Sequence, residues 1–166
     1  MKSITILLLS IISLTINAQH MKTVNETVSQ LFIATDNREW HNVEAIFATL
    51  VELDYSSMNG NPVVTLSPQQ ITSSWKTILP GFTHTHHQLG NFITKVNGAK
   101  AEVFCYGTAT HYLEDNEGNV WTVVGSYNFE LHQLNKQWKI AKMKFNYKYQ
   151  DGNTKLPEKA IEKLKQ

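Results

Sequence analysis

The sequence lacks what several large classes of protein need. It has one cysteine, Cys105, so no disulfide can form within the chain and no cysteine-based zinc site is expected. It has no CxxC pair and no glycine-rich loop of the kind that holds phosphate. Lys and Arg number 15 against 14 Asp and Glu, so the basic excess that nucleic-acid binding needs is absent. We therefore expect no nucleic-acid partner.

Long apolar runs are also scarce, and the single one stands at the start of the chain. Lys2 precedes an apolar stretch from Ile4 to Ile16, which Ala18 follows as a small residue at a plausible cleavage point. This run is too short for a membrane span and is typical of a secretory signal. We expect residues 1–18 to be a signal peptide and the protein to be exported, periplasmic or secreted. The alternative is an uncleaved N-terminal anchor.

The remaining chain has the composition of one folded domain. Hydrophobic residues make up 42% of the sequence and charged residues 17%, which is enough to build a core. No second run reaches membrane length, so no membrane span is expected. We place the domain at residues 22–150. Residues 151–166 form a lysine-rich tail whose apolar spacing indicates a short surface helix.

Hydrophobic periodicity predicts helices first and long strands afterwards. Helical spacing covers residues 22–35, a short segment from Trp40 to Phe47, and a segment that opens at Ser67-Pro68 and ends before Pro80. Alternation predicts a strand over 50–56 and four long strands over 82–96, 100–114, 119–134 and 137–149. This order indicates an α+β fold. We expect a cone-shaped curved antiparallel sheet wrapped around about three N-terminal helices, with a pocket at one end.

Polar side chains on the inward faces of these elements are the candidate functional residues, because buried polarity is costly unless it is used or satisfied. His111 is the one strongly polar residue on an otherwise small and apolar strand face. Thr85, His87 and Asn91 share a face of the preceding strand, and Asp36 ends the first helix beside its apolar stripe. Three tyrosines on strands add to the set, namely Tyr55, Tyr127 and Tyr147.

Four segments together carry a family resemblance. They are TDNREWHNVEAIFATLVELDYSS (35–57), LPGFTHTHHQLGN (79–91), GTATHYLED (107–115) and QWKIAKMKF (137–145). In order and spacing they resemble the SnoaL-like group of the nuclear-transport-factor-2-like superfamily, and within it the scytalone dehydratases. The resemblance covers nearly all of residues 22–150. It implies the cone-shaped fold and a pocket that serves enzymes and binding proteins alike.

The resemblance also implies roles, position by position. Asp36 resembles the acid that holds the catalytic imidazole, and His87 resembles that imidazole. His111 resembles the second pocket histidine, and Tyr55 resembles a tyrosine that positions a catalytic water. The sequence departs from the dehydratase pattern at Thr35, where that group has a second water-holding tyrosine.

A second set of residues is expected to line the pocket and contact the substrate. Trp40 and Asn91 match the group's pattern, and Tyr127 and Tyr147 have apolar neighbours on the same strand face. For all four, packing in the core is the alternative.

The residues independently suggest acid–base chemistry. A carboxylate beside an imidazole fixes its tautomer and favours its charged form, so the pair can move a proton alpha to a carbonyl. The resulting hypothesis is a cofactor-free lyase, dehydratase or isomerase for a small cyclic or aromatic carbonyl compound. It needs no metal and no organic cofactor. The partners expected are a small apolar or aromatic molecule and a second copy of the chain, bound through the outer sheet face.

Simpler interpretations remain open. The alternative function is a non-catalytic binder of a small apolar ligand, which would tolerate Asp36 and His87 lying apart. His87 and His111 could be satisfied core residues, and Asp36 could simply cap the second helix. A metal site using His84 and His86 is a further alternative, because both lie on one strand face.

Overall fold

The computed structural model describes residues 23–166, so the predicted signal peptide over residues 1–18 lies outside the described residues. The helical elements are a helix over residues 23–36, α2 (Trp40–Ile46), α3 (Ser56–Asn59), α4 (Pro68–Lys76), the 3-10 turn η1 (Leu79–Gly81) and α5 (Leu156–Lys163). The strands are β1 (Phe47–Asp54), β2 (Val64–Leu66), β3 (His84–Asn97), β4 (Lys100–Tyr112), β5 (Val120–Leu134) and β6 (Gln137–Gly152). No helix within residues 23–166 is long and apolar enough to cross a membrane.

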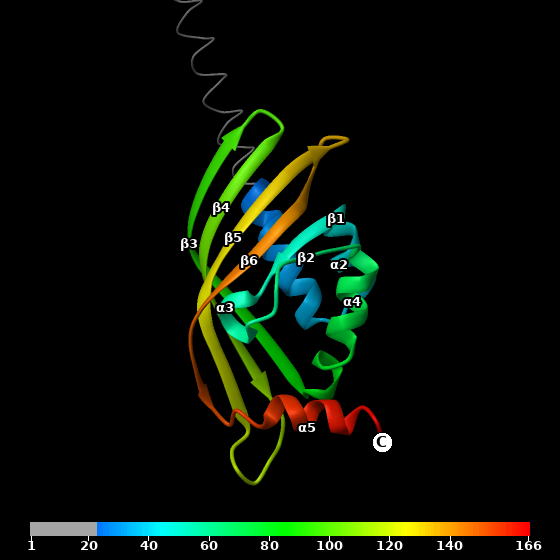
Figure 1. Cartoon of the computed structure of the whole chain (residues 1–166), viewed down its shortest axis with the longest axis vertical. Helices are drawn as coiled ribbons and strands as arrows, with labels where there is room; N and C mark the ends of the chain where they lie inside the picture. Colours follow the sequence, from blue (N-terminus) through cyan, green and yellow to red (C-terminus); the bar gives the residue numbers. More distant parts are fainter. Residues whose placement is uncertain (1–22) are drawn as a thin grey trace, which may run out of the picture.

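The strands form one curved, unclosed sheet in the order β2-β1-β6-β5-β4-β3 (Figure 1). This α+β architecture confirms the predicted fold class. The four long strands pair as antiparallel neighbours, as the hairpin signals between them predict. The sheet is antiparallel as predicted except at one place, where β1 runs parallel to β6. β1 enters from the helical layer through α2 rather than through a hairpin, so its direction is set by that crossover.

The helix over residues 23–36 packs into the concave face of the sheet. Its apolar stripe is buried, with Val24, Val28 and Leu31 fully inaccessible to solvent. The ring of Phe32 lies 5.0 Å from that of Tyr127 on β5. The spacing of these residues is the helical periodicity seen in the sequence, so the stripe both forms the helix and fixes which side faces the sheet.

The chain after this helix differs from prediction because β1 begins earlier and ends earlier than expected. Phe47 starts the strand instead of ending α2, and Tyr55 follows the strand instead of lying within it. Asp54 stops the strand, since its Oδ1 accepts hydrogen bonds from the backbone N–H and the hydroxyl of Ser56 at 3.0 and 2.6 Å. These bonds start the short helix α3. A second Asp54 oxygen faces the ammonium of Lys144 at 3.2 Å.

The C-terminal helix α5 crosses the lower end of the molecule in Figure 1 and is part of its packing. Leu156 and Ala160 are fully buried. Lys159 forms ion pairs with Asp115 at 2.5 Å and with Glu117 at 3.1 Å in the turn between β4 and β5. The predicted tail helix therefore exists, and its apolar side closes one end of the domain.

Gly81 allows this closure, which generates a prediction. A Cβ added at Gly81 would lie 2.1 Å from the carbonyl oxygen of Ala160, an impossible contact with backbone. We expect Gly81→Ala to destabilise the fold by about 1–3 kcal/mol, as overpacking does. Gly90→Ala is the control, because a Cβ at Gly90 meets nothing within 4 Å. Thermal unfolding of both variants checks this, and equal melting temperatures would contradict the tight packing of α5.

Candidate active site

Asp36 joins the end of the first helix to the edge of the sheet. Its Oδ1 accepts hydrogen bonds from the hydroxyl of Thr85 at 2.8 Å and from Nδ1 of His87 at 2.7 Å. Its Oδ2 accepts the backbone N–H of His87 at 2.7 Å. Since β3 is an edge strand, that N–H has no neighbouring strand to bond, and the carboxylate takes the place of one. The helix and the sheet are thereby held in one relative position.

These contacts set the chemistry of the His87 ring. A carboxylate can only accept, so Nδ1 of His87 carries a proton, and in the neutral form of the ring Nε2 has a free lone pair. Burial by itself raises the pKa of the Asp36 carboxyl, but its hydrogen bonds to His87 and the charge of that ring outweigh burial and hold the pKa below its ordinary value. Asp36 is therefore an anion at neutral pH, able to stabilise a protonated His87.

His87 opens onto an inner cavity of about 130 Å³ between the sheet and α3. The His87 side chain is 12% exposed, which a sealed core histidine would not be. The cavity is lined by Tyr55, Met58, His87, Ala109, His111, Trp121, Val123, Tyr127 and Phe145. Four of the predicted site residues thus meet in one space: His87, His111, Tyr55 and Tyr127.

His111 forms the wall opposite and is neutral at physiological pH. Its ring packs against the rings of Phe82 and Trp121, with centroids 4.8 and 4.5 Å away, and lies 6.0 Å from the His87 ring. Burial and the nearby His87 lower the pKa of His111 to about 4. Nδ1 lies 3.4 Å from the carbonyl oxygen of Trp121, an acceptor, so Nδ1 carries the proton here as well.

The two tyrosines supply hydroxyl groups. Burial raises the pKa of Tyr55 and of Tyr127 well above the ordinary value, so both phenols stay protonated and can donate. The ring of Tyr127 fits against β4 because Gly107 has no side chain: a Cβ there would lie 2.4 Å from the ring. Tyr55 points into the cavity while Asp54, one residue earlier, pairs with Lys144 outside it.

A larger outer hollow of about 560 Å³ adjoins the inner cavity, and Tyr55 and His87 line both. β1, α3, β2, α4 and η1 form its walls. Its lining residues are Leu53, Tyr55, Asn59, Asn61, Pro62, Val64, Leu66, Ser74, Trp75, Ile78, Leu79 and His87. This hollow was not predicted, because no pattern in the sequence indicated a helix at α3 or a strand at β2.

Three residues predicted to line the pocket lie elsewhere. Asn91 is exposed at a bulge in β3 between Gly90 and Ile93, with a positive φ of 57°. The bulge shifts the strand's two-residue alternation, so Asn91 no longer shares the face of His87. Trp40 is half-buried at the start of α2, with the ammonium of Lys76 5.6 Å from its ring centroid. Tyr147 lies beside α3, its backbone N–H bonded to the Ser57 hydroxyl.

Other residues of the site were given no role from the sequence. Thr85 is the clearest, since alternation already placed it on the face of His87 and a hydroxyl there can bond to a carboxylate. Phe32 packs on the His87 ring with centroids 5.0 Å apart. Its place in the apolar stripe of the helix indicated that it faces inward. Nothing in the sequence pointed to Met58 of α3, because a helix of four residues is too short to show hydrophobic periodicity.

The structure also decides between earlier alternatives. Asp36 does not cap α2, which begins after Glu39 without a side-chain cap. Among residues 23–166, no group of three His, Cys, Asp or Glu side chains could hold a metal ion. Cys105 is fully buried, and burial raises the pKa of its thiol to about 12, so it is a packing residue.

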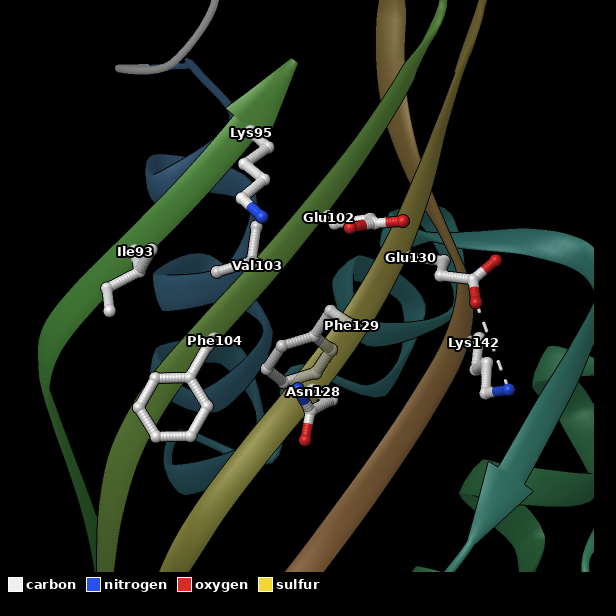
Figure 2. Close-up of a pocket in the computed structure, with 9 residues that line it drawn as sticks. All are labelled: Ile93, Lys95, Glu102, Val103, Phe104, Asn128, Phe129, Glu130 and Lys142. Atoms are coloured by element: carbon white, nitrogen blue, oxygen red, sulfur yellow. Dashed lines mark ion pairs between the residues drawn. The ribbon is translucent and has the colours of Figure 1, made fainter. Parts of the chain in front are cut away.

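A third hollow, of about 260 Å³, lies on the other side of the sheet (Figure 2). Apolar side chains of Ile93 and Phe104 stand there beside charged ones. Lys142 pairs with Glu130 at 3.8 Å and with Glu52 at 2.8 Å. The hollow holds no imidazole or phenol, so it offers no acid–base pair like that of the inner cavity.

A curved sheet around helices, with a polar cavity inside, defines the class: a cone-shaped α+β pocket protein. The SnoaL-like domain matches residues 18–144, and the chain belongs to this family. No curated protein sequence matches the chain.

Solved structures agree on the fold. The Kfla4162 protein from Kribbella flavida is 20% identical with a TM-score of 0.79, covering 85% of this chain and 99% of its own. A candidate scytalone dehydratase from Novosphingobium aromaticivorans is 18% identical with a TM-score of 0.69, covering 81% and 88%. A type 2 hexachlorocyclohexane dehydrochlorinase is 15% identical with a TM-score of 0.69, covering 82% and 90%.

The lowered pKa of His111 predicts how stability depends on pH. The unfolded imidazole titrates near 6.5 and the folded one near 4, so the unfolded state binds more protons between these values. Stability is therefore complete above about pH 6.5 and falls as the pH drops toward 4, by at most about 3 kcal/mol. Chemical denaturation at several pH values measures this slope.

His111→Gln should remove most of that slope, whatever it does to stability at pH 7. His41→Gln, a change on the exposed side of α2, is the control and should keep the slope. An unchanged slope between pH 6.5 and 4.5 in His111→Gln would show that His111 is not buried as a neutral ring.

Proposed function

We propose that this protein is a cofactor-free acid–base enzyme, a lyase or dehydratase or an isomerase, acting on a small cyclic or aromatic carbonyl compound. The observation that carries the proposal is the Asp36–His87 pair, bonded at 2.7 Å, with the ring of His87 at the wall of a cavity. A general base must be within reach of the proton it removes, and Nε2 of His87 is the ring atom free to accept it.

The proposed reaction begins with proton transfer from carbon. Nε2 of His87 takes a proton from the carbon alpha to the carbonyl, and the electron pair of the broken C–H bond forms an enolate. Asp36 stabilises the imidazolium through Nδ1. The protonated Tyr55 and Tyr127 are the donors available to the enolate oxygen. Return of the proton to another carbon completes an isomerisation. Its delivery to a departing hydroxyl group, as water, completes an elimination.

The relatives support the same class of chemistry. The candidate scytalone dehydratase and the hexachlorocyclohexane dehydrochlorinase are both named for eliminations. Thr35 does not replace a water-holding tyrosine, because its hydroxyl donates to the carbonyl of Leu31 at 2.7 Å within its own helix. The proposal therefore rests on proton abstraction by His87 and not on a water held at position 35.

The geometry favours an enzyme over a non-catalytic binder. A binder has no use for a carboxylate that satisfies one imidazole nitrogen and leaves the other facing a cavity. An apolar ligand would be held more simply by apolar walls, since desolvating polar groups weakens its binding.

Two further parts of the proposal concern location and assembly. Export rests on residues 1–18 alone. A second copy of the chain is proposed to cover the outer sheet face, where Ile93 is 61% exposed and Tyr106 44%. Figure 2 shows two lysines and two glutamates, Lys95, Glu102, Glu130 and Lys142, on the strands beside Ile93, so a twofold-related copy could match charges with their opposites.

Enolisation can be tested without knowing the natural substrate. In D₂O, the full chain should exchange the alpha protons of cyclohex-2-enone faster than buffer does, as followed by ¹H NMR. His87→Ala should lower the protein-catalysed rate by about 10²- to 10⁴-fold, the usual contribution of a general base. Asp36→Asn should lower it too, because the amide cannot stabilise the imidazolium.

His86→Ala is the matched control, because His86 is the neighbouring histidine on the opposite, exposed face of β3. Circular dichroism shows whether each variant is folded. Exchange by the wild-type chain no faster than by buffer, or equal loss in the His86 and His87 variants, would overturn the catalytic proposal.

The dimer proposal has its own measurement. Light scattering coupled to size exclusion should report a dimer for the wild-type chain and a shift toward monomer for Ile93→Asp. Leu50→Asp on β1 is the control, since Leu50 is 61% exposed as well but does not line the third hollow, which Ile93 does. A monomeric wild-type chain would contradict this assembly.

A further inference from the structure

The inner cavity and the outer hollow form one bipartite space, which restricts the ligand. Tyr55 and His87 line both parts, so the proposed base stands where they meet. The inner part measures about 130 Å³ and the outer about 560 Å³. A ligand that reacts at His87 therefore has one end in each part.

The inner part has room for a single ring. In another protein, an apolar cavity of about 150 Å³ holds one benzene molecule. The rings of Phe145 and Tyr127 face each other with centroids 4.8 Å apart and close the cavity on the sheet side. A fused second ring would need these side chains to move.

The polar groups of the inner part indicate which oxygen-bearing groups a bound ligand ring would have. His111 donates from Nδ1 to the carbonyl of Trp121, so its Nε2 can only accept. A hydroxyl group on the ring is the natural donor for this nitrogen. Tyr55 and Tyr127 are the donors, and neither hydroxyl has a hydrogen-bond partner among residues 23–166, so both are free to bond a ligand carbonyl.

The outer part has a different character. Most of its walls are apolar, from Leu53, Val64, Leu66, Trp75, Ile78 and Leu79. Val64 remains 40% exposed, so apolar surface here is in contact with water. An apolar chain laid along these side chains would remove that surface from water, at a gain of about fourfold in affinity for each buried methylene.

We propose that the ligand is a hydroxylated single-ring ketone that carries an apolar tail, with the ring in the inner cavity and the tail in the outer hollow. The carbonyl carbon and its alpha carbon then lie between the two parts, beside Tyr55 and His87. This inference rests on the proposed function for the identity of the reacting atoms, and on the shape of the two spaces for everything else.

Binding of three aryl ketones to the full chain, measured by isothermal titration calorimetry, tests the inference. 1-(4-Hydroxyphenyl)hexan-1-one has four more methylenes than 4′-hydroxyacetophenone, and we expect it to bind at least about tenfold more tightly. Acetophenone lacks the ring hydroxyl and should bind about fivefold more weakly than 4′-hydroxyacetophenone, the usual effect of one hydrogen bond. Equal affinities in the first comparison, or no binding of any ketone, would overturn the proposal.

Two neighbouring valines give a matched pair of variants. Val64→Glu places a charge in the outer hollow and should remove the advantage of the long-tailed ketone without weakening the short one. Val63→Glu is the control, because Val63 is 47% exposed and lines neither space. Equal losses in the two variants would overturn the position of the tail.

These results separate the ligand from the catalysis. Tail-dependent binding without alpha-proton exchange would support the bipartite ligand and count against the catalytic role of His87. Exchange by the wild-type chain without any tail dependence would support the enzyme and overturn the ligand proposed here.

Discussion

The carboxylate of Asp36 is the group on which the site depends. It belongs to the helical layer, yet its hydrogen bonds go to the edge strand of the sheet. One oxygen replaces a missing backbone partner and the other orients an imidazole, so the same group fixes the fold and the ring. Loss of the carboxylate would leave the backbone N–H of His87 without a hydrogen-bond partner. It would also leave the His87 ring free to rotate, so one substitution at Asp36 affects both the fold and the chemistry.

The two histidines show how the protein sets the polarity of a cavity. Each neutral imidazole gives its Nδ1 proton to a fixed acceptor, Asp36 for His87 and the carbonyl of Trp121 for His111. The acceptor's charge then decides the outcome. The acceptor beside His87 is an anion, whereas a neutral carbonyl in a buried setting does not prevent the pKa of His111 from falling to about 4. Two residues of one type therefore become a candidate base and a neutral hydrogen-bond acceptor.

Hydrophobic periodicity in the sequence predicted much of the fold. The features that it did not predict have physical causes. Alternation and turn residues predicted the four long strands, and the order of elements with the family resemblance predicted the meeting of Asp36 and His87. The bulge at Asn91 could not be predicted, because a prediction from alternating hydrophobicity takes the strand to be unbroken. The parallel pairing of β1 was hidden because it depends on how α2 crosses over. Tyr55 was expected on a strand, but the side chain of Asp54 ends that strand and turns the tyrosine inward.

The space inside the cone is created as much by small residues as by large ones. Gly107 gives the Tyr127 ring its position, and Gly125 does the same for Phe145, since a Cβ there would lie 2.5 Å from that ring. With both rings drawn toward the sheet, a cavity remains between them and α3. The short segment from Tyr55 to Leu66 contributes walls to both this cavity and the outer hollow. Substitutions in that segment should change which molecules fit, whereas Asp36 and His87, anchored to β3, keep the proposed chemistry in place. The segment after Tyr55 thus sets ligand preference, while the proposed base and its carboxylate lie in other parts of the chain.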